Sequence, residues 1–324
     1  MPAVETARGP VDVDGLGPTL MHEHVFVTSA EYVQNHGAGA WWDEEERVAD
    51  AITRLNRLAA KGFTTIVDPT VWGLGRYIPR IQRIAEQISV HIIVATGIYS
   101  YNDIPFQYDY RGPGLMFDGP EPMAEDFTRD ITDGIGTTGI KAAFLKCAIE
   151  AAGLTPGVER IARAVAQTHR DTGVPITVHT SSPARTGRLA VDLFGKEGVD
   201  LSKVVIGHAG DTNDLDYLMA LADTGAILGM DRFGLDVFNP TAERVATIAA
   251  LCGRGYADRM VLSHDASCFM DWFAPDPASA IQAAAPNWHY EHISDDVLPA
   301  LREAGVTEAQ LGQMLVANPK RYFS

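Results

Sequence analysis

Two histidines separated by a single residue, His22 and His24 in the segment MHEHVF, are the first side chains that could do chemistry. Side chains alternate between the two faces of a β-strand, so both imidazoles point to one face and Glu23 to the other. Two imidazoles on one face can bind the same metal ion. An isolated His-x-His fits two polar residues at a strand end equally well, so the interpretation depends on the rest of the chain.

Four further predicted strands end in a potential ligand or reactive side chain: Lys146, His179, His208 and Asp265. In (β/α)8 barrels the carboxyl ends of the strands face the active site, where residues far apart in sequence converge. Taken singly, each histidine would be read as an ordinary buried imidazole. Together, four imidazoles and one carboxylate form a ligand set that suits zinc, iron, cobalt or manganese rather than calcium or magnesium.

Lys146 requires its own explanation, because an ammonium beside divalent cations would be repelled and costly to desolvate. Its neutral amine could react with CO2 to give an anionic carbamate that bridges two metals. Two alternatives are a Schiff-base lysine and an ammonium that reaches solvent at the mouth of a barrel. A Schiff-base site would have no use for the surrounding histidines, so we favour the carbamate.

The elements that position these side chains alternate between short β-branched segments and helical periodicity, which is the pattern of βαβ units. The spacing predicts strands at Thr19–Val25, Thr64–Asp68, His91–Thr96, Ile140–Lys146, Pro175–Thr180, Lys203–His208, Ala226–Asp231 and Arg259–Asp265. It predicts helices at Asp43–Ala60, Tyr77–Gln87, Pro122–Ile135, Val158–Thr172, Gly187–Gly198, Leu215–Asp223 and Thr241–Cys252. We therefore expect an α/β chain folded as one (β/α)8 TIM barrel domain over residues 1–324. An open doubly wound sheet would want a GxGxxG turn after its first strand, and none follows Val25.

Two segments lie outside this repeating pattern. Ala3–Gly17 has Gly and Pro between two alternating stretches, which predicts a short N-terminal β-hairpin that caps one end of the barrel. Ala266–His289 is an unusually long connection after the eighth strand, and long loops in compact domains are usually functional. Its aromatic and methionine side chains could accommodate an apolar acyl tail, and they are Phe269, Met270, Trp272 and Phe273.

Composition excludes several classes of protein. The 324 residues contain 26 Lys and Arg against 42 Asp and Glu, a formal net charge of −16, which disfavours nucleic acid or an anionic membrane as partner. No apolar run reaches the ~18 residues of a membrane helix, and the N-terminus lacks the apolar segment of a signal peptide. The three cysteines have no CxxC spacing. We expect a cytoplasmic protein without disulfides.

The chain resembles the phosphotriesterase family of the amidohydrolase superfamily, and within it the phosphotriesterase-like lactonases. The segments that carry the resemblance extend from residue 20 to the final NPKRYF: LMHEHVF, TTIVDPTVWGLGR, VATGIYSYND, TGIKAAFLKCA, VVIGHAGDTNDLDYL, GMDRFGLDVF, MVLSHDASC and NWHYEHISDDVLPAL. The resemblance implies a homodimer with two divalent ions, Zn, Fe, Co or Mn. It implies an α metal held by His22, His24 and Asp265. It further implies a β metal held by His179 and His208, and N6-carboxylysine at Lys146 joining both ions with a bridging hydroxide.

The same resemblance implies a lactonase that uses the bridging hydroxide as nucleophile, with Asp265 as ligand and general acid/base. Tyr99 and Arg232 match positions that border the metals and help place the substrate, although Arg232 could instead form a salt bridge at the barrel rim. Three further positions match pocket-lining residues: Leu74, Phe238 and Trp272. The implied substrates are acyl-homoserine lactones, hence quorum quenching, and γ/δ-lactones, with weaker hydrolysis of organophosphate triesters.

Three alternative functions remain open. One is an enzyme whose primary activity is that of a phosphotriesterase (aryldialkylphosphatase). Another is a catalytically silent barrel that serves as a binding protein. A silent barrel would be expected to have lost a ligand, and all are present in the sequence. A metal-dependent nuclease would need a basic groove, which the charge of −16 disfavours.

Overall fold

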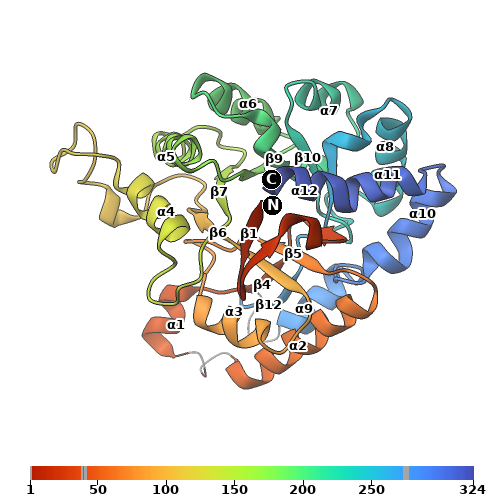
Figure 1. Ribbon diagram of the computed structural model, residues 1–324, viewed down its shortest axis with the longest axis horizontal. Helices are drawn as coiled ribbons and strands as arrows, with labels where there is room; N and C mark the ends of the chain where they lie inside the picture. The colour runs from red at the N-terminus through yellow and green to blue at the C-terminus, as the bar shows by residue number, and fades with distance from the viewer. Residues whose placement is uncertain (1, 38, 40–41, 273–276) are drawn as a thin grey trace.

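The computed structural model describes residues 2–37, 39, 42–272 and 277–324. Within these residues, parallel strands form an eight-stranded sheet in the order β11-β10-β9-β8-β7-β6-β5-β3 (Figure 1). The strands of this sheet are β3 (Thr19–Leu20), β5 (Thr65–Asp68), β6 (His91–Gly97), β7 (Phe144–Ile149), β8 (Ile176–Thr180), β9 (Val204–Gly207), β10 (Ile227–Met230) and β11 (Met260–Leu262). Consecutive parallel strands need a crossover, and helices supply it.

The sheet curls so that its first and last strands meet. The Met21 amide next to β3 donates to the Leu262 carbonyl oxygen of β11 at 3.3 Å, and Asp265 N donates to His22 O at 3.0 Å. Apart from His91 at the start of β6, every residue of these strands is buried, as expected when side chains fill the barrel on one side and helices cover the other. The predicted (β/α)8 barrel is confirmed.

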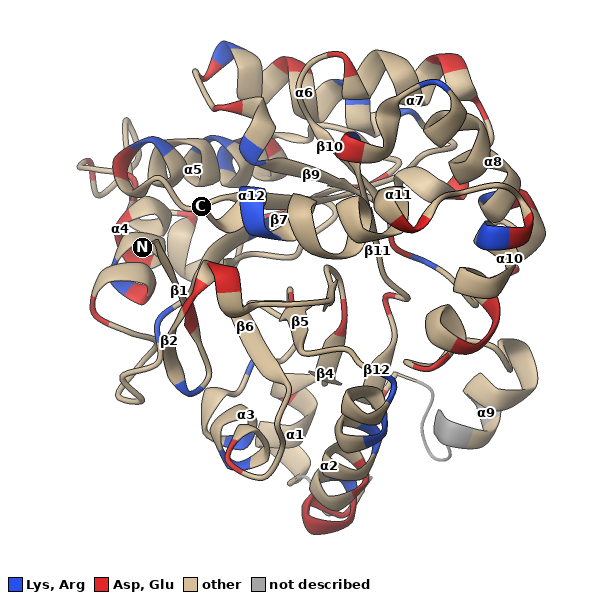
Figure 2. Ribbon diagram, turned by 45° about the vertical axis from the view of Figure 1, so that its right-hand side comes forward, with Lys and Arg blue, Asp and Glu red and all other residues tan. Residues whose placement is uncertain are grey.

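The helices surround the barrel, and Figure 2 shows their outer faces carrying Lys and Arg mixed with Asp and Glu. They are α1 (Ala30–His36), α2 (Glu44–Ala60), α3 (Ile78–Ala85), α4 (Pro122–Thr132), α5 (Pro156–Thr172), α6 (Thr186–Lys196), α7 (Leu215–Ala222), α8 (Thr241–Gly253), α9 (Pro277–Ala284), α10 (Leu298–Glu303), α11 (Glu308–Gly312) and α12 (Asn318–Phe323). Helix α5 ends as its sequence predicts, because Gly173 takes the left-handed conformation at φ 78°.

The predicted N-terminal hairpin is also confirmed. Strands β1 (Ala3–Thr6) and β2 (Gly9–Asp12) pair antiparallel. They lie over one end of the barrel together with α12, and both chain termini are found there (Figure 1). Val4 of the hairpin and Tyr322 and Phe323 of α12 belong to one apolar cluster with the barrel interior. The hairpin and the last helix therefore seal the end of the barrel opposite the predicted ligands.

Three predicted strands differ by several residues from those in the structure. The predicted strand Arg259–Asp265 ends as β11 at Leu262, so Asp265 follows its strand and does not end it. The predicted strand Thr19–Val25 is interrupted: after β3 the chain leaves the sheet, and β4 (His24–Val27) pairs with β12 (Ser267–Met270). The predicted strand Ile140–Lys146 begins only at Phe144 and continues to Ile149, because Cys147–Ile149 pair with β8. The prediction that Lys146 ends its strand is therefore wrong, and Lys146 lies third of six residues in β7.

The part of the chain after β11 contains more regular structure than its sequence suggested. The predicted long connection Ala266–His289 holds β12 and α9, and the helical segments after it were not predicted. Alanine-rich and proline-containing stretches carry a weak apolar period, which explains why the sequence pattern missed them. Phe273, which we expected in the apolar loop, lies outside the described residues.

We predict that Gly97→Ala destabilises the barrel beside the site. Gly97 pairs with Lys146 and has φ 138°, and a Cβ there would lie 1.9 Å from the Lys146 carbonyl oxygen. Moving β7 or straining β6 should cost at least about 3 kcal/mol. Thermal unfolding followed by circular dichroism is the measurement. In the control Gly253→Ala a Cβ would meet open space, so a change within about 1 kcal/mol is expected. Equal melting temperatures for the two variants would contradict the close packing of β6 on β7.

Candidate metal centre and substrate cavity

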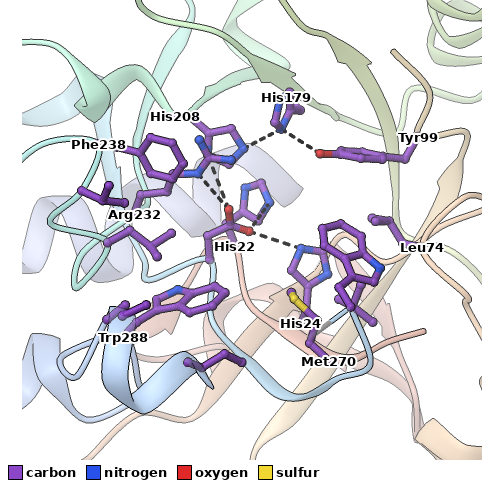
Figure 3. Close-up of a pocket in the computed structure, with 18 of the residues that line it drawn as sticks. His22, His24, Leu74, Tyr99, His179, His208, Arg232, Phe238, Met270 and Trp288 are labelled. Atoms are coloured by element: carbon purple, nitrogen blue, oxygen red, sulfur yellow. Dashed lines mark hydrogen bonds and ion pairs between the residues drawn. The ribbon is translucent and has the colours of Figure 1, made fainter. Parts of the chain in front are cut away.

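A cavity of about 610 Å³ opens at the carboxyl ends of the barrel strands (Figure 3). The predicted metal ligands and pocket residues all line it: His22, His24, Leu74, Tyr99, Lys146, His179, His208, Arg232, Phe238, Asp265 and Trp272. Met270 of the predicted apolar loop lines it too, but the expectation for Phe269 is wrong, because its ring is buried in the core against Phe26 and Trp42. They come from segments more than 240 residues apart. The barrel thus brings the whole predicted set to one place.

One group of donors consists of His22, His24 and Asp265. The Nε2 atoms of both histidines lie 3.3 Å from Asp265 Oδ1. Around a tetrahedral zinc with bonds of about 2.1 Å, neighbouring donor atoms are about 3.4 Å apart. The three side chains therefore fit a single transition-metal ion, and Glu23 points to the opposite side as the alternation predicted.

A second group consists of His179 and His208. His179 Nδ1 and His208 Nε2 lie 2.8 Å apart, facing each other across the cavity floor (Figure 3). His179 is the fourth residue of β8, whereas His208 follows β9 in a left-handed conformation at φ 64°. That backbone conformation is uncommon for a residue with a Cβ, and such strain is often found at functional sites.

Lys146 lies between the two groups, with Nζ 3.4 Å from His22 Nε2. The side chain is only 1% exposed. Burial lowers the pKa of Lys146 to about 8, and the charge of Asp265 opposes this shift. The neutral amine is therefore much more accessible near pH 7 than for an exposed lysine.

The other ring nitrogen of each histidine is held by the protein. Asp231 accepts from Nδ1 of both His22, at 3.1 Å, and His208, at 2.9 Å. Thr70 Oγ1 lies 2.7 Å from His24 Nδ1. Glu150 Oε2 lies 2.5 Å from His179 Nε2. Such partners fix the tautomer and orient the free nitrogen toward a metal.

Sequence reasoning missed these three partners. Asp231 was the last residue of a predicted strand, which was the available signal, but nothing in the sequence pointed to Thr70 or Glu150. His22, His208 and Asp231 are themselves close enough to hold an ion. Because Asp231 already binds both Nδ1 atoms, we assign it to orienting the two histidines.

Burial favours the neutral form of three of the histidines, His22, His179 and His208. It lowers the pKa of His22, lowers that of His179 to about 4 despite its bond to Glu150, and lowers that of His208 well below its usual value. The hydrogen bond to His179 in turn lowers the pKa of Glu150 to about 2. Neutral imidazoles are the metal-binding form, so the cluster is prepared to coordinate.

Asp265 and Arg232 form an ion pair at the edge of the site, with Nε 3.0 Å from Oδ2. Burial alone would raise the pKa of Asp265, but His22, His208 and Arg232 together lower it well below its usual value. Arg232 Nη1 also binds Asp211, which Arg244 holds from the other side. The rim salt bridge considered for Arg232 therefore exists, and one of its partners is a predicted metal ligand.

The remaining wall of the cavity is largely apolar. Leu74 is buried, whereas Phe238 and Trp272 are about half exposed, so neither aromatic is core. The sequence missed several further lining residues: Val27, Tyr101, Leu235, Val237, Ile281, Ala284, Ala285 and Trp288. Tyr99 stands at the border with the metal cluster, its hydroxyl 3.4 Å from His179 Nδ1 and 2.5 Å from Tyr101 Oη.

Comparison with known proteins identifies the family to which this site belongs. The model of the phosphotriesterase family matches residues 2–323. The chain belongs to the phosphotriesterase family. Members of this family are metal-dependent hydrolases with a binuclear centre. His22, His24 and Asp265 lie close enough together to hold one ion, and His179 and His208 bring two further imidazole nitrogens to the same cavity.

Relatives within the phosphotriesterase family carry different names. A phosphotriesterase homology protein of Mycobacterium tuberculosis is 56% identical over 100% of this chain and 98% of its own length. An aryldialkylphosphatase of Saccharolobus solfataricus is 36% identical over 98% of each chain.

Solved structures of the phosphotriesterase family superimpose closely. The phosphotriesterase from M. tuberculosis gives a TM-score of 0.96 at 56% identity, covering 100% of this chain and 98% of that chain. A protein from the molecular engineering of organophosphate hydrolysis on a weak promiscuous lactonase template gives a TM-score of 0.90 at 33% identity, covering 99% of this chain and 100% of that chain.

In the part of the chain that the structure describes, we find no helix long and apolar enough to cross a membrane.

We predict that Asp231→Asn weakens metal binding by about 10- to 100-fold. His22 Nδ1 donates to Oδ2 and His208 Nδ1 to Oδ1, and asparagine replaces one of these acceptors with an NH2 group that cannot accept. Competition with a chelator, followed by elemental analysis, measures the loss. Asp130→Asn is the control, because Asp130 binds Arg76 and Thr96 away from the cavity. Equal metal affinity in the two variants would remove Asp231 from its orienting role.

Proposed function

We propose that this protein is a binuclear-metal hydrolase that opens lactone rings, acyl-homoserine lactones and γ/δ-lactones among them. One observation carries the proposal: two groups of metal-type donors and a buried lysine meet at the floor of a cavity whose other walls are apolar. The floor suits hydrolysis of an uncharged electrophile. The walls suit a hydrocarbon chain attached to it.

In the proposed site, His22, His24 and Asp265 hold one ion, His179 and His208 hold the other, and Lys146 joins them as N6-carboxylysine. Two bound divalent ions of the Zn, Fe, Co or Mn type would supply a hydroxide nucleophile at neutral pH and polarise the carbonyl. The lysine assignment follows from charge. Four neutral imidazoles and one carboxylate leave two divalent ions short of anions, and a carbamate adds one negative charge.

Asp265 is the proposed proton carrier. Its low pKa keeps it ionised, and the bond from Arg232 Nε fixes its orientation. It accepts the proton lost when the nucleophile adds to the carbonyl and returns it to the leaving alkoxide. That alkoxide remains part of the same molecule, so the product is a single hydroxy acid.

Tyr99 and Arg232 place the substrate above this floor. Burial raises the pKa of Tyr99, so its hydroxyl stays protonated and can donate a hydrogen bond to a substrate oxygen. The tail would then run between apolar walls, with Leu74 and Met270 on one side of the cavity and Phe238 on the other (Figure 3). Trp272 also lines this cavity. Phe238 is held by Arg232, whose guanidinium lies 4.9 Å from the ring centre.

An organophosphate triester is a second candidate substrate, since it is also uncharged and develops oxygen charge during hydroxide attack. The relative named aryldialkylphosphatase supports it as a primary activity. We place it second because the apolar wall favours one long substituent. A silent binding protein has little support, since all the proposed ligands are present.

The homodimer and the cytoplasmic location expected from the sequence stay predictions. Exposed apolar side chains gather in one excursion of the chain between β6 and α4, and they are Phe106, Tyr110, Met116 and Phe117. A second copy of the chain would cover them.

We predict that purified enzyme hydrolyses at least one lactone with an apolar tail more efficiently than paraoxon. Acyl-homoserine lactones, γ/δ-lactones and paraoxon are assayed in parallel with the same metal-loaded preparation. A tenfold excess of kcat/KM for paraoxon over every lactone, about 1.4 kcal/mol of transition-state preference, would make the phosphotriesterase reading the better one. DNA serves as the control substrate and should not be cleaved.

We predict that Lys146→Ala loses metal and activity together, by more than about 100-fold. Acetate or propionate should restore part of both by occupying the place of the carbamate. Lys61→Ala is the control, because Lys61 pairs with Asp295 on the outer surface. This variant should keep its metal and activity, and acetate or propionate should not affect it.

The same lysine predicts a pH dependence for loading metal into wild-type apoprotein. Only the neutral amine reacts with CO2. The fraction of Lys146 in this form rises with pH and becomes the larger one above the pKa of about 8. At fixed dissolved CO2 the loading rate should therefore rise with pH up to about 8 and level off above it. Electron density for an unmodified amine in active, fully loaded protein would contradict the carbamate.

A further inference from the structure

The acidic residue between the two histidines of MHEHVF has no part in the proposed reaction. Glu23 is completely buried, on the side of the chain opposite the cavity. Burying a carboxylate is costly unless it is hydrogen-bonded or paired, so its contacts should explain why it is there. Those contacts all come from the segment that contains Asp265.

The carboxylate of Glu23 binds the backbone on both sides of Asp265. Its Oε1 accepts from the His264 amide at 2.8 Å, and its Oε2 accepts from the Ala266 amide at 3.0 Å. Oε1 also accepts from Ser263 Oγ at 2.8 Å and from His264 Nδ1 at 2.6 Å. The two oxygens thus accept hydrogen bonds from four donors on three residues, Ser263, His264 and Ala266, which lie on both sides of Asp265.

Asp265 needs such support because of its backbone. Its φ of 55° lies in the left-handed region, which residues with a Cβ seldom occupy. A strained conformation persists only where the surroundings determine it. The Asp265 amide donates to His22 O at 3.0 Å, so the turn is tied to the Glu23 strand by a further bond.

His264, which binds Glu23, is itself held in place by other residues. His264 Nε2 accepts from the Ile293 amide at 2.9 Å, so the ring proton is on Nδ1 and is donated to Glu23. His264 is fully buried, and its carbonyl accepts from Trp288 Nε1, a residue of the cavity wall. The network therefore connects the segment between β3 and β4, the turn after β11 and the C-terminal helical region.

We infer that Glu23 is a positioning residue that sets the backbone of Asp265 and thereby aims its carboxylate at His22 and His24. The two histidines flank Glu23 on the same short segment. The Glu23 side chain therefore fixes the positions of His22, His24 and Asp265, the three proposed ligands of one ion, relative to one another. This inference rests on the metal site of the proposed function.

The test uses full-length protein loaded with Co2+, whose visible spectrum reports ligand geometry. In Glu23→Gln one carboxylate oxygen becomes an amide that cannot accept, so either the His264 or the Ala266 N–H loses its partner. We expect an altered Co2+ spectrum and release to a chelator at least tenfold faster. Lactone kcat should fall at least 30-fold while KM stays within threefold, because Tyr99 and Arg232 are untouched.

The control is Tyr322→Phe, which removes a buried bond to Thr177 Oγ1 at the opposite end of the barrel. It should lower the melting temperature without changing spectrum, release rate or kcat. If Glu23→Gln behaved in the same way, Glu23 would be structural only and the inference overturned. If Glu23→Gln fails to fold, Glu23→Asp is used in its place in the same measurements. One methylene shorter, it cannot reach both amides, so a wild-type spectrum in that variant would also overturn the inference.

The same experiment separates this inference from the proposed function. Wild-type protein that bound no Co2+ would contradict the metal site itself. Wild-type protein with a normal spectrum, beside an unchanged Glu23→Gln, would contradict only the role of Glu23.

Discussion

An imidazole has two nitrogens, and the site is built on the requirement that one be held so that the other is free. A buried ring with neither nitrogen satisfied would be costly, and a ring with both satisfied by protein could not bind an ion. Each of the four histidines meets this condition. Two of them share one partner, and the other two each have a partner of their own. Asp231 serves His22 and His208, Thr70 serves His24, and Glu150 serves His179.

This requirement explains why the site needs a closed barrel. The partner of His22, which follows β3, is Asp231, which follows β10, and the carboxylate beside His22 is Asp265, which follows β11. Only when the last strands return to the first can these groups meet. Local irregularity completes the geometry, since His208 and Asp265 both leave their strands in a left-handed turn. Regular strands would have aimed these side chains at the barrel wall or at solvent.

The sequence predicted the parts of this design that repeat or that have distinctive chemistry. Eight β-branched segments indicated the barrel, and histidines at strand ends indicated the floor of the cavity. It did not predict Glu150 or Thr70, because one carboxylate or hydroxyl in a loop has no spacing that sets it apart. It placed Lys146 at a strand end, since an apolar run cannot reveal where pairing stops. The helices after β11 were missed for a related reason, as their apolar period is short and interrupted by proline.

The arrangement of charges also bears on what could leave the proposed site. A lactone enters uncharged, but a hydroxy acid leaves as an anion. Arg232 is the cation nearest the reacting centre among the described residues that line the cavity, apart from Lys146. Its Nε and Nη1 are already bound to Asp265 and Asp211. A guanidinium engaged by two carboxylates attracts a third only weakly, and the nearby Glu150 adds repulsion. The same ion pair that keeps Asp265 ionised and oriented would therefore keep Arg232 from adding much to the attraction between the product carboxylate and the two bound ions.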